Sequence, residues 1–153
     1  MLFKLKLFSE KEMETFGHRL SQVLIPPMFM ALEGALGAGK TTLVRAILRG
    51  LGYSGRVKSP TYTLVESYDL PHVHIFHLDL YRIEDPQALE FLGIEEIFQA
   101  NALWLVEWPS KGKGFLPIPD FICRIDLKAG TERHLQLESL SEKGERIMET
   151  LSI

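Results

Sequence analysis

Residues 34–41 of the chain read Gly34-Ala35-Leu36-Gly37-Ala38-Gly39-Lys40-Thr41. The stretch matches the pattern G-x-x-x-x-G-K-[ST] at every fixed position, and loops of this kind cradle phosphate groups. Glycines have no Cβ, so the backbone can approach a phosphate closely and point successive N–H groups at it. We therefore expect Lys40 to contact the β- and γ-phosphates of a nucleotide and the Thr41 hydroxyl to bind Mg²⁺. The alternative is a glycine-rich turn that matches the pattern by chance.

The residues on either side of the loop favour the phosphate site. The apolar run Met28 to Leu32 precedes the loop and is typical of a buried parallel strand. After the loop, apolar residues recur at helical spacing from Leu43 to Leu51. A helix that begins at the loop directs the positive end of its dipole at the phosphates. The residues expected to contact the nucleotide here are Gly37, Ala38, Gly39, Lys40, Thr41 and Thr42.

Strand and helix patterns alternate along the rest of the chain. Ser9 and Glu12 form a capping-box pattern at the start of a helix that ends before Pro26. Asp85 is predicted as the N-cap, and Pro86 as the first residue, of a short helical stretch. A closing helix is predicted at residues 141–151, and strands are predicted at residues 2–7, 63–68, 74–80, 103–106, 121–127 and 134–137.

These elements predict an α/β fold in a single domain spanning residues 1–153. We expect a P-loop NTPase-like, mixed and mainly parallel sheet flanked by helices. The last two strands form a C-terminal antiparallel hairpin around a glycine-containing turn.

Composition and charge limit the classes of function. Of the 153 residues, 46% are hydrophobic and 24% are charged, as in an ordinary globular domain. The net charge of −3 argues against nucleic-acid binding by bulk electrostatics. The single cysteine, Cys123, cannot form an intramolecular disulfide, which suits a reducing compartment. Neither a signal-peptide pattern nor an apolar run long enough for a bilayer is present, so we expect a cytoplasmic protein without membrane contact.

Two acidic residues end strand patterns where α/β sheets present ligand groups. Glu107 follows the apolar residues 103–106 and is the candidate acid near Mg²⁺, with a solvated strand-end acid as the alternative. Asp79 could hold the water shell of the metal or position the attacking water, since phosphoryl transfer depends on positioning and charge. His77 is expected to be an ordinary strand histidine, and Arg82 could form a surface ion pair with Asp79 or Glu84.

Other segments have both a functional and a structural interpretation. Residues 59–63, Ser-Pro-Thr-Tyr-Thr, follow the phosphate-loop helix where switch-like loops occur, and Thr61 could sense a γ-phosphate there. A simple strand entry is the alternative. Trp108 is either a core anchor or part of an interface. Residues 110–114 are basic and glycine-rich, and we interpret them as a solvated turn rather than a closing loop.

The nucleotide is predicted to be ATP rather than GTP. An N-K-x-D guanine signature is absent, because the only asparagine is Asn101, and there is no D-x-x-G switch.

Several segments together resemble one family, the TsaE (YjeE) ATPases. They are residues 34–42, 59–66 (S-P-T-Y-T-L-V-E), 77–82 (H-L-D-L-Y-R), 92–93 and 107–109 (E-W-P), and the resemblance covers nearly the whole chain. It implies an accessory ATPase that binds the TsaD and TsaB proteins and supports the formation of threonylcarbamoyladenosine in tRNA, with tRNA reached through that complex. One departure is Ala35, at a variable loop position where many members carry an acid.

The resemblance also implies roles for individual residues. Lys40 would hold the phosphates, Thr41 and Glu107 would hold Mg²⁺, Asp79 with Thr61 would act in hydrolysis, and Trp108 would lie at the active face. Glu10 and Arg133 would contact the base. Two other classes remain open: a small-molecule P-loop kinase, and a nucleotide-gated binding module that needs no hydrolysis.

Overall fold

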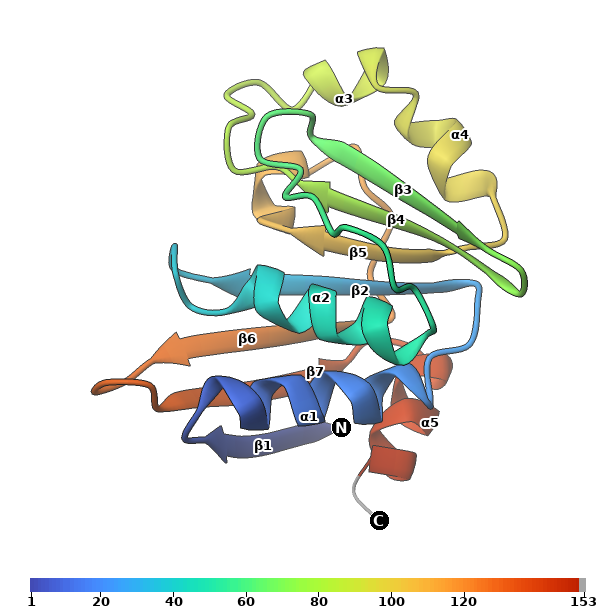
Figure 1. Ribbon diagram of the computed structural model, residues 1–153. Coiled ribbons are helices and arrows are strands. Elements are labelled where there is room, and N and C mark those ends of the chain that lie inside the picture. Colours follow the sequence, from blue (N-terminus) through green and yellow to red (C-terminus); the bar gives the residue numbers. More distant parts are fainter. Residues whose placement is uncertain (152–153) are drawn as a thin grey trace.

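A computed structural model describes residues 1–151 (Figure 1), and its framework is one seven-stranded sheet with the order β1-β7-β6-β2-β5-β4-β3. The strands are β1 (Leu2–Leu7), β2 (Met28–Gly34), β3 (Val65–Leu70), β4 (Val73–Asp79), β5 (Leu103–Glu107), β6 (Phe121–Leu127) and β7 (Arg133–Ser139). The apolar strand β2 lies in the middle of this order, between β5 and β6. The phosphate-loop pattern therefore emerges from the centre of the sheet.

The sheet is mixed, as the sequence predicts. β2 pairs in parallel with β5 and β6, and β4 pairs in parallel with β5. The pairs β1–β7, β6–β7 and β3–β4 are antiparallel. All strands except β3 and β7 consequently run in the same direction, and the predicted C-terminal hairpin is the pair β6–β7. The carboxyl ends of β2, β4 and β5 meet at one edge, where ligands bind in α/β sheets.

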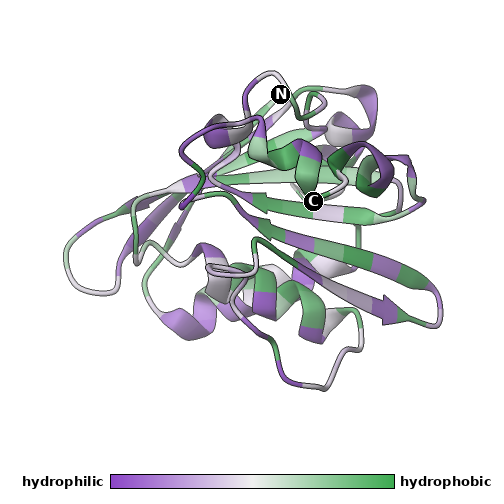
Figure 2. Ribbon diagram, turned by 90° about the horizontal axis from the view of Figure 1, so that it is seen from above, coloured by the Kyte–Doolittle hydropathy of each residue, from purple (hydrophilic) through white to green (hydrophobic). Residues whose placement is uncertain are grey.

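Helices cover both faces of the sheet. They are α1 (Glu10–Ser21), α2 (Lys40–Gly50), α3 (Ala88–Phe91), α4 (Ile94–Gln99) and α5 (Glu142–Leu151), with a 3₁₀ turn, η1, at Pro109–Gly112. Figure 1 shows α1 and α2 side by side over one face, and Figure 2 shows apolar residues concentrated along the strands between the helical layers. No helix within residues 1–151 is long and apolar enough to cross a membrane.

Alternation along the strands divides the core into two layers. Met30 and Leu32 of β2 join the cluster that includes α1, α2 and α5, while Phe29 and Ala31 join the cluster that includes α3 and α4. α1 and α2 approach each other closely, since a Cβ on Gly17 would lie 2.4 Å from the Cβ of Ala46. The helix that follows the phosphate loop therefore packs against both the sheet and α1.

Two short segments differ only in detail from their predictions. α3 begins at Ala88 with Gln87 as its N-cap, two residues after the predicted N-cap. Asp85 still caps the turn that leads into this helix, since its Oδ1 accepts a hydrogen bond from the Gln87 N–H at 3.0 Å and its carbonyl oxygen accepts one from the Ala88 N–H. The predicted turn at residues 110–114 is exposed at Ser110, Lys111, Lys113 and Gly114, as expected, and only Gly112 is buried. A Cβ on Gly112 would lie 2.9 Å from side-chain carbons of Leu89 and Leu116, so η1 packs against the core.

Candidate functional site

The glycine-rich loop connects β2 to α2, as predicted. Gly34, the last residue of β2, has a φ of 155°, and a Cβ there would lie 2.7 Å from the Ile125 carbonyl oxygen of β6. Gly39 is the N-cap of α2 with a φ of 114°, which L side chains rarely adopt. α2 begins directly after it, so the N-terminus of an 11-residue helix faces the loop. This geometry has the features of an anion-binding cradle.

Lys40 lies beneath the loop with only 5% of its surface exposed. Its Nζ donates hydrogen bonds to the carbonyl oxygens of Gly34 (2.5 Å) and Ala35 (3.0 Å), and it lies 4.6 Å from the ring centroid of Trp108. Burial lowers the pKa of Lys40, and two nearby carboxylates oppose that shift. The ammonium is therefore held in place by the loop itself, where a phosphate could reach it.

Glu107 ends β5 and is 2% exposed. Its Oε2 lies 2.6 Å from Nε2 of His77 on the neighbouring strand β4. The Thr41 hydroxyl of α2 lies 3.3 Å from Oε1 and 3.2 Å from Oε2 of the same carboxylate. Thr41 and Glu107 are thus in direct contact although they are 66 positions apart in the chain. Both are predicted from the sequence as Mg²⁺ ligands.

Asp79 ends β4 and is aligned with Glu107 across the parallel β4–β5 pair. Its Oδ1 accepts a hydrogen bond from the Tyr81 N–H at 3.0 Å, and the Thr61 hydroxyl donates to its Oδ2 at 3.4 Å. Burial is the largest cause that raises the pKa of Asp79. The Tyr81 N–H opposes the shift, and the charge of Glu107 adds to it. The predicted Asp79–Thr61 pair is therefore formed at the edge that also carries Glu107.

Aromatic residues surround this edge. Trp108 has a φ of 57°, which is uncommon for a bulky side chain, and its ring centroid lies 5.0 Å from that of Tyr81. Backbone strain of this kind is concentrated at functional sites. Arg82 forms neither of the predicted ion pairs, because its guanidinium lies 4.4 Å from the ring centroid of Tyr62 and donates to the Tyr62 hydroxyl at 3.3 Å.

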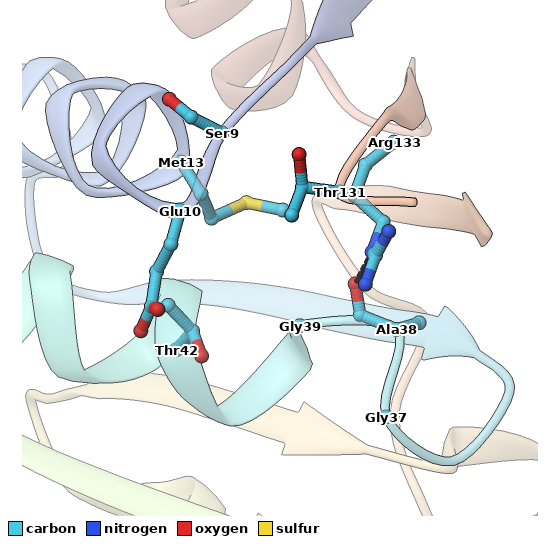
Figure 3. A pocket seen from close by; sticks show the side chains of 9 residues that line it. All are labelled: Ser9, Glu10, Met13, Gly37, Ala38, Gly39, Thr42, Thr131 and Arg133. Carbon is cyan, nitrogen blue, oxygen red and sulfur yellow. Dashed lines mark hydrogen bonds between the residues drawn. The ribbon is translucent and has the colours of Figure 1, made fainter. Parts of the chain in front are cut away.

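A pocket of about 250 Å³ opens beside the loop (Figure 3). It lies between the start of α1, the loop and the β6–β7 turn, and its lining residues are Ser9, Glu10, Met13, Gly37, Ala38, Gly39, Thr42, Thr131 and Arg133. Both residues predicted to contact the base, Glu10 and Arg133, border this pocket. Figure 3 shows the Glu10 side chain extending toward Thr42 from α1.

Arg133 also donates hydrogen bonds to backbone carbonyl oxygens of the protein. Its Nε donates a hydrogen bond to the Ala38 carbonyl oxygen at 3.0 Å, and its Nη1 donates to carbonyl oxygens of Gly130 and Glu132. The guanidinium therefore holds the phosphate loop against β7, whatever contact it makes with a base.

The residues at this edge suit a magnesium–nucleotide site. Hydroxyl and carboxylate oxygens, as on Thr41 and Glu107, are the ligands that Mg²⁺ prefers. Within residues 1–151 there is no group of three or more His, Cys, Asp or Glu side chains that could enclose a metal. A site with few protein ligands suits an ion that keeps several waters and is held partly by nucleotide phosphates.

The sequence interpretation did not include the contact between His77 and Glu107. The H-x-D spacing contains a usable signal, because His77 and Asp79 must point to the same face of β4. Nothing in the local sequence indicates that β5 lies next to β4 and presents Glu107 to that face. The pocket residues Ser9, Met13 and Thr131 were also not predicted.

Comparison with protein families identifies the chain. The model of the family "Threonylcarbamoyl adenosine biosynthesis protein TsaE" matches residues 7–136. The chain belongs to the TsaE family. The resemblance inferred from the motifs is confirmed, and the match includes the glycine-rich loop, Asp79 and Glu107.

Known TsaE proteins are similar over most of the chain. The tRNA threonylcarbamoyladenosine biosynthesis protein TsaE of Haemophilus influenzae is 41% identical over 148 residues, covering 94% of this chain and 93% of the relative. The protein of the same name from Bacillus subtilis is 35% identical over 127 residues, covering 83% of this chain and 79% of the relative. TsaE proteins are thus named for a part in modifying tRNA.

The fold is also that of a solved relative. The crystal structure of Bacillus subtilis YdiB aligns with a TM-score of 0.86 at 26% identity, covering 99% of this chain and 95% of the other. The mixed sheet flanked by helices is therefore the architecture of a known structure as well as the one predicted from the sequence.

Proposed function

We propose that this TsaE protein binds ATP with Mg²⁺ and hydrolyses it in support of the TsaD–TsaB complex, which forms threonylcarbamoyladenosine in tRNA. The observation that carries the proposal is the convergence of Lys40, Thr41 and Glu107 at the glycine-rich loop. The chain would act in the cytoplasm and reach tRNA only through the complex.

Each residue has a role that follows from its position. Lys40 and the loop N–H groups would hold the phosphates, and Thr41 and Glu107 would hold Mg²⁺. The bound ion would neutralise charge on the phosphates. Asp79, hydrogen-bonded by Thr61 and Tyr81, lies where it could orient a water molecule. Gly37, Ala38, Gly39 and Thr42 complete the cradle, with Glu10 and Arg133 at the pocket for the base.

Trp108 is proposed as part of the active face. Its ring centroid lies 4.6 Å from the Lys40 ammonium and 5.0 Å from the ring centroid of Tyr81, so it would border the phosphate site. A partner that contacts Trp108 would also change the surroundings of Lys40. This geometry supports an ATPase whose rate depends on its partners.

The test is ATP hydrolysis by the purified chain, alone and with TsaD–TsaB. Wild type is compared with Lys40→Ala and Glu107→Ala, and with the exposed-site controls Lys111→Ala and Glu138→Ala. We expect slow hydrolysis by the chain alone, a faster rate with the partners, and loss of both in the two site variants only. Absence of ATP binding with Mg²⁺ would contradict the proposal, and an unchanged rate with the partners would contradict the accessory role.

The kinase alternative loses support from the structure of residues 110–114. A P-loop kinase usually covers the transferred phosphate with an arginine-rich lid, whereas here Gly112 is packed against Leu89 and Leu116. Transfer of phosphate to a metabolite by the chain alone would restore that alternative. A binding module without hydrolysis would keep its effect on TsaD–TsaB in Glu107→Ala.

A further inference from the structure

His77 is a buried histidine with one hydrogen bond. Its side chain is 0% exposed, and its Nε2 lies 2.6 Å from Glu107 Oε2. Its other ring nitrogen, Nδ1, has no hydrogen-bond partner within residues 1–151. Burying a polar atom without a partner costs free energy, so packing alone does not explain a histidine here. An apolar side chain would fill the same space without that cost.

An apolar residue at position 77 could not form the hydrogen bond to Glu107. His77 lies on β4 beside Leu105 of β5, and it faces the same side of the sheet as Ile75 and Leu105, toward α2. From that position Nε2 reaches only one oxygen of the Glu107 carboxylate, while Thr41 on α2 contacts both oxygens. The carboxylate is thus held between a strand and a helix, and its rotation is restricted from two sides.

The geometry points to His77 as a positioning residue that orients the Glu107 carboxylate toward Thr41 for a Mg²⁺–nucleotide. This inference rests on the proposed function. His77 donates through Nε2 and touches neither the phosphate loop nor Lys40 by any hydrogen bond within the described part of the chain. Groups that orient a metal-binding carboxylate typically change metal affinity or activity by about 10- to 100-fold when they are removed.

Three variants separate positioning from packing. His77→Met fills the space without a donor. His77→Gln places an amide nitrogen at a reach similar to that of Nε2, and His77→Asn places the same group one methylene short. His74→Met is the matched control, because His74 lies on the same strand but is one-third exposed and contacts Asp69 instead. Thermal melting identifies the variants that fold.

The measurement is binding of a fluorescent ATP analogue, titrated with Mg²⁺ and repeated with EDTA, followed by ATP hydrolysis. For His77→Met and His77→Asn we expect the Mg²⁺ concentration at half-effect to rise by about 10- to 100-fold, with affinity in EDTA unchanged. His77→Gln should recover most of the Mg²⁺ response, and His74→Met should match wild type.

The outcomes that overturn the inference differ from those that overturn the proposed function. If wild type responds to Mg²⁺ and His77→Met or His77→Asn responds equally, His77 does not position Glu107. The same holds if folded His77→Gln and His77→Asn respond alike, since only the reach of the donor differs between them. If wild type shows no Mg²⁺-dependent nucleotide binding, the proposed function fails and the inference fails with it.

Discussion

The half of the sheet formed by β2, β5, β4 and β3 differs from the half formed by β6, β7 and β1 in whether charged side chains are buried or exposed. Among residues 1–151, the buried polar or charged side chains are Lys40, His77, Asp79, Glu107 and Ser21, and all but Ser21 lie at the carboxyl edge of β2, β4 and β5. The other half, β6, β7 and β1, is called the antiparallel half because β7 pairs antiparallel with both neighbours. There Arg124 of β6 forms ion pairs with Glu138 of β7 and, across the boundary, with Glu33 of β2, and these side chains are 36–40% exposed. Charge is buried, at a cost in free energy, at the edge proposed to bind the nucleotide, whereas exposed ion pairs add little to stability.

The largest contrast should appear when one carboxylate is neutralised in each half. Glu107→Gln keeps the shape of the side chain but removes the charge beside Thr41, so we expect Mg²⁺-dependent ATP hydrolysis to fall by about 100-fold or more. Glu138→Gln should leave hydrolysis unchanged. Steady-state ATPase assays at saturating ATP check both variants, and a comparable loss in Glu138→Gln would remove the functional distinction between the halves.

The next largest effect is a loss of stability expected at Gly34, the last residue of β2, where β2 pairs with β6. A Cβ there would meet the Ile125 carbonyl oxygen of β6 at 2.7 Å. We expect Gly34→Ala to lower the free energy of unfolding by about 1–3 kcal/mol, measured by urea denaturation. Gly130→Asn is the control, because Gly130 has a φ of 61° with no atom within 4 Å of a Cβ and asparagine tolerates that conformation. Equal losses in the two variants would contradict the steric explanation.

A smaller effect, a gain in stability instead of a loss, is expected when Asp79 is replaced. Burial raises its folded-state pKa above the ordinary value for an aspartate, so the fold loses stability as pH rises from the unfolded-state pKa to the folded-state pKa, and the penalty is complete above the folded-state pKa. We expect Asp79→Asn to raise the melting temperature at pH 7, by about 2–4 °C for each kcal/mol gained, while hydrolysis is lost.

The gain in Asp79→Asn should disappear in acid, below the unfolded-state pKa, where wild-type Asp79 is protonated in both states. Differential scanning calorimetry across pH tests this sign, with exposed Asp69→Asn as the control. A melting temperature that falls in Asp79→Asn at neutral pH would show that the Thr61 and Tyr81 contacts outweigh the burial of charge.

The smallest effect is expected in the exposed network. Arg124→Gln should change the free energy of unfolding by less than about 1 kcal/mol, because partly exposed ion pairs are weakened by water and salt. Urea denaturation at low and high salt provides the measurement. A loss as large as that in Gly34→Ala would mean that charge stabilises the antiparallel half more than its exposure suggests.

Local sequence patterns were sufficient to predict where most helices and strands lie and to predict part of the candidate site. The glycines and Lys40 that define the loop are close together in the chain, so the loop and the start of α2 could be predicted directly. Period-two alternation likewise located β1 and β6 with correct bounds. Asp85 was correctly predicted to accept N–H groups at the start of the helical segment, and only the first regular helical residue, Ala88, lies two positions later than predicted.

The sequence by itself therefore determined the phosphate loop, the acids that end β4 and β5, and membership of the TsaE family. Only the tertiary structure decided that His77 holds Glu107 across 30 residues and that Arg133 holds Ala38 across 95. Those contacts depend on which strands are neighbours, with β5 beside β4 and β7 near the loop. Strand order arises from packing of the whole chain, and no local pattern of residues encodes it.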